Sequence, residues 1–143
     1  MATPFTSVYE RALAKIQDFE LAAMPELDLE DTLHGWLLSA ISKFRQCKND
    51  LSDRDEEHKV FNTDLDDTEI EILAIMLVRE WLSPRLNSVL TVSQFFSDSD
   101  QKFYSQAAHL SELQALDTRL KIEAQKLSRD YSYTSDVSGY FDS

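Results

Sequence analysis

The sequence predicts an all-α fold: a helical bundle of four principal helices with a long last helix and an extended C-terminal arm. The 143 residues include only two glycines and three prolines, too few for the glycine-dependent turns of a β-sandwich or a nucleotide-binding fold. Apolar residues instead recur every three or four positions, and an apolar content of 43% is enough for one core. We therefore expect a helical bundle domain over residues 1–131 and an arm over residues 132–143.

The first helix is predicted to begin at Pro4, because proline suits the first turn of a helix. It should end near Met24, since the residue before Pro25 is driven out of the α region. Its apolar stripe comprises Phe5, Val8, Tyr9, Ala12, Leu13, Ile16 and Phe19.

The second helix has the clearest pattern, with Asp28, Glu30 and Asp31 near the positive end of its dipole. Gly35 lies inside it, where glycine costs up to ~1 kcal/mol relative to alanine, and we expect the close approach of another helix to explain it. The buried face is predicted to comprise Leu33, Trp36, Leu37, Ala40, Ile41 and Phe44.

The third helix is predicted to start with a capping box, in which Thr68 and Glu71 satisfy each other's backbone donors. Pro84 should end or kink this helix, although Ser83 and Pro84 could equally begin a new short helix that runs to Val92. Its core residues are expected to be Ile70, Leu73, Ala74, Leu77 and Trp81.

The last helix is predicted to follow the cap-type residues 97–100 and to span about 30 residues. Its stripe comprises Phe103, Ala107, Leu110, Leu113, Leu116, Leu120, Ala124, Leu127 and Tyr131. From Ser132 the helical period disappears but aromatic residues persist. Because Tyr and Phe bury a large area at little entropic cost, we predict an assembly interface that comprises Tyr131, Tyr133, Tyr140 and Phe141.

Most of the negative charge lies in one segment. Residues 50–71, called the acidic segment below, contain ten acidic and two basic residues, a net charge of -8 out of -12 for the chain. Acidic residues spread over a surface mainly increase solubility, whereas acidic residues clustered in one segment create a local negative electrostatic potential. We predict an exposed acidic surface or channel lining formed by Asp50, Asp53, Asp55, Glu56, Glu57, Asp64, Asp66 and Asp67; the sequence leaves open whether it faces a channel or solvent.

Patterns typical of enzymes and metal sites are absent from the sequence. The three histidines lack zinc-ligand spacing, and the acidic segment has His58 where a calcium loop needs glycine. The chain has no GxSxG motif, and Cys47 has no recognisable base partner. We predict a protein that is not an enzyme and that uses no cofactor or metal.

Three further expectations concern the environment of the chain. The single cysteine excludes an intramolecular disulfide and favours a reducing compartment. No apolar run approaches the roughly 18 residues of a membrane span, so we expect no membrane association. A pI of about 4.5 disfavours the wrapping of nucleic acid, which needs clustered Lys and Arg.

Four local stretches and the order of the elements resemble small virion proteins of tailed bacteriophages that infect Gram-positive bacteria, in particular the head-tail connector (adaptor or neck) group. The stretches are residues 33–38 (LHGWLL), 48–55 (KNDLSDRD), 69–74 (EIEILA) and 103–107 (FYSQA). The resemblance implies a structural protein of the virion, assembled in the host cytoplasm as a homo-oligomeric ring, commonly twelve-fold, below the portal. It also implies that the portal protein and tail or neck proteins are partners and that DNA passes without specific binding.

An acidic lining would suit such a ring, because like charge lets DNA slide without sticking. Two alternatives remain open. One is another phage tail or assembly protein, such as a tail terminator or a chaperone. The other is an acidic regulator that mimics DNA and occupies a basic host protein.

Overall fold

The computed structural model describes residues 2–16, 19–95 and 100–141, with side chains described for residues 2–16, 21–88 and 108–132. The protein is mostly helical and also contains a small sheet. Its helices are α1 (Phe5–Leu13), α2 (Phe19–Ala23), α3 (Glu26–Lys43), α4 (Asp67–Phe95) and α5 (Asp100–Phe141). Its strands are β1 (Thr3–Pro4), β2 (Arg54–Asp55) and β3 (Val60–Phe61).

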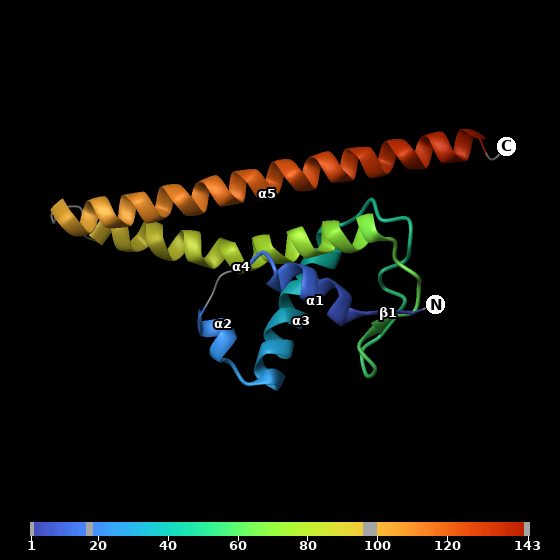
Figure 1. Ribbon diagram of the computed structural model, residues 1–143, viewed down its shortest axis with the longest axis horizontal. Coiled ribbons are helices and arrows are strands. Elements are labelled where there is room, and N and C mark those ends of the chain that lie inside the picture. The colour runs from blue at the N-terminus through green and yellow to red at the C-terminus, as the bar shows by residue number, and fades with distance from the viewer. Residues whose placement is uncertain (1, 17–18, 96–99, 142–143) are drawn as a thin grey trace.

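Helix α4 forms the centre of the molecule. Figure 1 shows α4 and α5 side by side as a long antiparallel hairpin, with α1 and α3 against the opposite side of α4. The first half of α4 is therefore covered on several sides. Its side chains make up much of the core, and those that are completely buried are Ile72, Leu73, Ala74, Ile75, Leu77, Val78 and Leu82.

The three-stranded sheet was not predicted, so the all-α expectation was wrong in this respect. Strands β2 and β3 form an antiparallel hairpin inside the acidic segment, and β1 pairs with β3 through Thr3 opposite Phe61. Pro4 is tolerated because β1 is an edge strand. The hairpin turn, residues 56–59, contains no glycine or asparagine, the residues that usually mark such turns in a sequence.

The predicted first helix is divided into α1 and α2, while the predicted stop before Pro25 agrees with the end of α2 at Ala23. Helix α3 covers the clearest predicted stripe, and Leu33, Leu37 and Ala40 are buried as expected. The explanation for Gly35 was wrong. A Cβ atom at Gly35 would meet nothing within 4 Å, so no neighbouring helix requires the glycine.

The start of α4 also differs from the prediction. The capping box is formed by Asp66 and Glu69 rather than by Thr68 and Glu71. The Glu69 N–H donates to Asp66 Oδ1 at 2.7 Å, and the Asp66 N–H donates to Glu69 Oε1 at 2.9 Å. These reciprocal bonds satisfy two backbone donors at the helix N-terminus.

Pro84 lies within α4, which continues to Phe95 instead of ending. Proline removes one N–H from the helix. The next residue, Arg85, reaches back to Trp81, about one turn earlier in the helix. Its guanidinium donates to the Trp81 carbonyl at 3.1 Å and lies 4.6 Å from the centroid of the Trp81 ring. Trp81 is buried as predicted, whereas Trp36 is only partly buried against the core.

Helix α5 is longer than predicted. It runs for 42 residues to Phe141, so the expectation of an extended arm from Ser132 was wrong, and the end of α5 projects past the start of α4 (Figure 1). The predicted cap residues 97–99 lie outside the described residues. The core stripe of α5 is confirmed at Leu120, Ala124 and Tyr131, which are buried.

In the described parts of the chain, no helix combines the length and apolar character that a membrane crossing requires.

Candidate functional site

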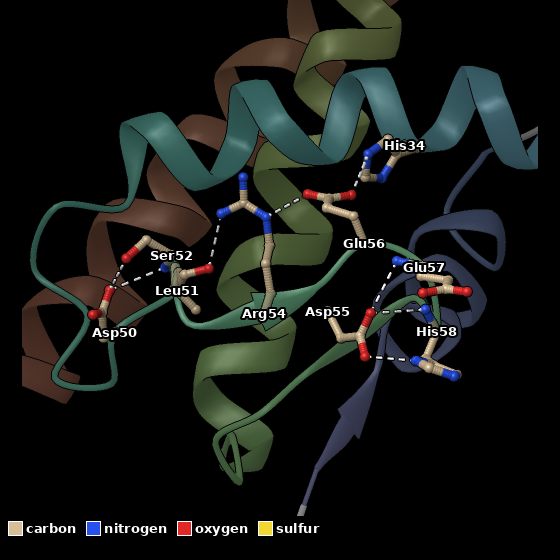
Figure 2. Close-up of polar contacts among 9 residues, drawn as sticks. All are labelled: His34, Asp50, Leu51, Ser52, Arg54, Asp55, Glu56, Glu57 and His58. Atoms are coloured by element: carbon tan, nitrogen blue, oxygen red, sulfur yellow. Dashed lines mark hydrogen bonds and ion pairs between the residues drawn. The ribbon is translucent and has the colours of Figure 1, made fainter.

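The acidic segment comprises most of the connection from α3 to α4 and the first residues of α4, and its own side chains order the connection. Asp50 accepts hydrogen bonds from the backbone N–H and the hydroxyl of Ser52 (Figure 2). Asp53 Oδ1 accepts from Asn62 Nδ2 at 2.9 Å, and the Asn62 N–H donates to the Asp53 carbonyl at 3.0 Å. The carboxylates thus replace the glycine-dependent turns that the sequence lacks.

Asp55 holds the turn of the β2–β3 hairpin. Its Oδ1 accepts from the backbone N–H groups of Glu57 and His58, both at 3.0 Å, and its Oδ2 lies 2.6 Å from His58 Nδ1 (Figure 2). The backbone and side-chain hydrogen bonds from His58 lower the pKa of Asp55. Lys59 completes the turn in the left-handed region, with a φ of 58°.

An ion-pair chain ties the hairpin to α3. Glu56 lies between Arg54 and His34 in Figure 2: Arg54 Nε donates to Glu56 at 2.6 Å, and His34 Nε2 lies 2.9 Å from the other carboxylate oxygen. The His34 ring stacks on Phe5, with centroids 5.6 Å apart. A second connection joins Lys59 to Glu30 at 2.8 Å.

The other end of the acidic segment is tied to α1. Arg11 contacts Asp67 at 3.0 Å and Glu71 at 3.1 Å, and Lys15 contacts Glu71 at 2.7 Å. Partial burial opposes the ionisation of Glu71, but the hydrogen bonds from Lys15 and Arg11 outweigh burial and lower its pKa. Glu71 therefore joins α1 to α4, rather than capping α4 as predicted.

Glu69 is a buried carboxylate that joins three parts of the chain. It is 1% exposed. Besides the Asp66 N–H, its carboxylate accepts from Asn49 Nδ2 at 2.8 and 3.1 Å, Cys47 Sγ at 3.0 Å and the Tyr131 hydroxyl at 2.9 Å. Burial raises the pKa of Glu69, but these hydrogen bonds outweigh burial and lower it.

Tyr131 lies in the core, not in the predicted assembly interface. It is 7% exposed, and its hydroxyl accepts from the Lys48 N–H at 2.8 Å while it donates to Glu69. Its ring contacts Phe44 edge-on, with centroids 5.8 Å apart. The other predicted interface residues, Tyr133, Tyr140 and Phe141, occupy the projecting end of α5, and their side chains lie outside the described part of the molecule.

Of the eight carboxylates predicted to form the acidic surface, seven are exposed and Asp55 is partly exposed, but most of them also have structural partners. Asp50, Asp53, Asp55 and Asp66 accept local hydrogen bonds, and Glu56 and Asp67 form ion pairs. Glu57 and Asp64 are exposed, and their side chains form no hydrogen bond or ion pair with the described residues. They are the two carboxylates of the surface most available to a partner.

Two findings concern chemical reactivity. Among the described residues, no group of three or more His, Cys, Asp or Glu side chains is placed to hold a metal ion. Burial and the hydrogen bond to Glu69 raise the pKa of the Cys47 thiol to about 12. Cys47 therefore stays protonated near neutral pH and is a poor nucleophile.

The Glu69 cluster was not foreseen from the sequence. The sequence did contain a signal for part of the cluster, because Asp66 and Glu69 have the same spacing as the predicted capping pair, Thr68 and Glu71. Nothing local in the sequence connects Glu69 to Cys47 or to Tyr131, which is 62 residues away.

No protein-family model, curated protein or solved structure matches the chain.

Proposed function

We propose that the chain is a structural virion protein, a head-tail connector that forms a ring below the portal of a tailed bacteriophage. The observation that best supports this function is an acidic surface held rigidly at one end of an elongated helical molecule. Ion pairs tie this surface to both α3 and α1. A fixed negative surface along a channel repels DNA phosphates and lets the duplex pass without binding.

The end of α5 provides a second element of the proposal. Residues 132–141 continue the helix beyond the body of the molecule (Figure 1). Tyr133, Tyr140 and Phe141 are seven and eight residues apart, which places these positions on one face of a helix. The arm would therefore dock on the portal or on a neighbouring subunit as a helix in a groove rather than as an extended strand.

Electron microscopy of the purified chain, alone and mixed with portal protein, tests this function. We expect a ring, either alone or on addition of portal. Substituting Tyr133 and Tyr140 with serine should abolish assembly with the portal, while the matched variant Ser135→Ala/Ser138→Ala on the same helical segment should assemble normally. A chain that stays small and binds a basic protein with steep salt dependence would instead support the DNA-mimic alternative.

Removal of charge tests the role of the acidic surface. The informative variant is Asp50→Asn/Asp53→Asn, because an amide oxygen can still accept the local hydrogen bonds of these two exposed residues, whereas loss of Asp66, which caps α4, or of Asp67, which pairs with Arg11, would also destabilise the fold. Particles that carry this variant should assemble but deliver DNA poorly if the surface lines the channel. Normal genome delivery would exclude that role.

A further inference from the structure

A basic groove lies where the C-terminal end of α3 meets α4 and α5. It has a volume of about 500 Å³ and a partly apolar floor that includes Phe44, Met76 and Ala124. Five of the fourteen Lys and Arg residues of the chain line it, and no carboxylate does: Lys43, Arg45, Arg79, Lys121 and Arg129. Such a concentration of positive charge contrasts with a net charge of -12.

Three of these cations lack a carboxylate partner among the residues that the structure describes. Lys43 pairs with Glu80 and Arg79 pairs with Asp117 at 3.2 Å, and these two carboxylates line a second pocket that shares Lys43, Met76 and Arg79 with the groove. No ion pair with a described residue involves the other three: Arg45, Lys121 and Arg129. Like charges held close together repel one another, and an anionic group bound between them would relieve that repulsion.

The chain also carries the complementary surface. The acidic segment has a net charge of -8, and none of its residues lines the groove. Its most available carboxylates, Glu57 and Asp64, are exposed. Two unlike, complementary patches on one chain define a heterologous contact, which closes into a ring when the rotation between subunits allows it.

We propose that the part of the acidic segment that carries Glu57 and Asp64 in one copy of this chain docks in the basic groove of the next copy, which leaves the other carboxylates of the segment free to face a channel. Opposite charges would set the register and speed the encounter, and the apolar floor would add buried area. A second copy suits the groove better than DNA does. Three cations without an ion pair to a described residue neutralise few phosphates, and the net charge of the whole chain opposes binding to a polyanion.

This inference deepens the proposed function by naming the contact between neighbouring subunits, and it is measured without portal. If the chain self-associates through the groove but fails to engage portal, the connector function fails and the inference stands. If it assembles with portal while the groove proves irrelevant to self-association, the inference fails and the connector function stands.

Analytical ultracentrifugation of the full chain at low and high salt tests the contact. We expect self-association that weakens as salt is added. The variant Lys121→Glu/Arg129→Glu should weaken association about tenfold or more, as the loss of complementary charge at an interface predicts. The matched control Arg119→Glu/Lys126→Glu makes the same change in net charge on exposed positions of α5 outside the groove, and it should associate nearly as the native chain does.

The decisive measurement is a mixture. Lys121→Glu/Arg129→Glu retains the native acidic segment, and Glu57→Lys/Asp64→Lys retains the native groove. Each variant should associate weakly alone. The two together should associate strongly, because each supplies the surface that the other lacks. A native chain that stays monomeric at low salt would overturn the proposal, as would equal weakening by the control variant. Loss of duplex DNA binding in the groove variant with unchanged self-association would also overturn it and identify a polyanion site.

Discussion

Replacing Glu69 with glutamine keeps the size of the side chain and removes its charge, which isolates the contribution of the buried carboxylate. The carboxylate accepts hydrogen bonds from the Asp66 N–H, Asn49, Cys47 and Tyr131. A hydrogen bond to a charged group contributes about 1.5–3 kcal/mol and a neutral one about 0.5–1.5 kcal/mol. The amide group of glutamine also turns one acceptor oxygen into a donor.

The expected loss follows from these contacts. Losing about 1 kcal/mol of charge assistance at each of the three donors that keep a partner, and about 1 kcal/mol at the fourth donor, which then faces the NH2 group, gives about 4 kcal/mol. The lower cost of burying a neutral amide returns part of this loss, so we expect Glu69→Gln to lower the free energy of unfolding by about 2 kcal/mol. Urea unfolding followed by circular dichroism at pH 7 would measure it.

Two variants serve as comparisons for Glu69→Gln. Glu71→Gln removes a carboxylate two residues away that is tied by more exposed ion pairs, so its cost should be no more than about 1 kcal/mol. Tyr131→Phe removes one donor to Glu69 and the acceptor of the Lys48 N–H, so its cost should be about 1–2 kcal/mol.

The pH dependence gives a separate check. Because the folded state lowers the pKa of Glu69, its contribution is fully present above the unfolded pKa and is lost as the pH falls through the folded pKa. The difference between the native chain and Glu69→Gln should be constant near neutral pH and narrow in acid, below the ordinary range of a glutamate. A difference below about 0.5 kcal/mol at pH 7, within the range of ordinary surface substitutions, would refute the reasoning. So would a difference that persists unchanged in strong acid.

Two further predictions concern single positions. Gly35→Ala should stabilise the chain by up to about 1 kcal/mol, because the glycine is inside α3 and a Cβ there meets open space; an unchanged or lower melting temperature would contradict this. The raised pKa of Cys47 predicts that a thiol reagent modifies the folded chain far more slowly than the urea-unfolded chain at pH 8. Equal rates would show that the thiol is not held by Glu69.

The helices were predictable to the extent that a single apolar face defines them. The stripe of α3 and the core positions of α4 agree with the structure at Leu33, Leu37 and Leu77. The predictions failed where the end of a helix was inferred from a proline or from the loss of the apolar period. Pro84 was predicted to end or kink the helix or to begin a new short one, and α4 does not end there but continues to Phe95. The absence of a helical period after Ser132 suggested an extended arm, but a helix that has already formed adds residues at low cost.

The negative charge of the candidate site was predictable from the sequence, but its hairpin and its side-chain hydrogen bonds were not. The sequence shows that residues 50–71 are strongly acidic. It does not show that Asp55 builds a hairpin turn, because that turn uses a side chain in place of the usual glycine.

The sequence by itself determined only local features. These are the apolar period of the helices, the position of the negative charge and the stop before Pro25, and each is a property of neighbouring residues. Only the tertiary structure decided that Glu69 is a buried acceptor for Cys47 and Tyr131 and that Arg45, Lys121 and Arg129 share one groove. These groupings join residues far apart in the chain. They depend on how α3, α4 and α5 pack, and the spacing of residues within any single helix does not contain that information.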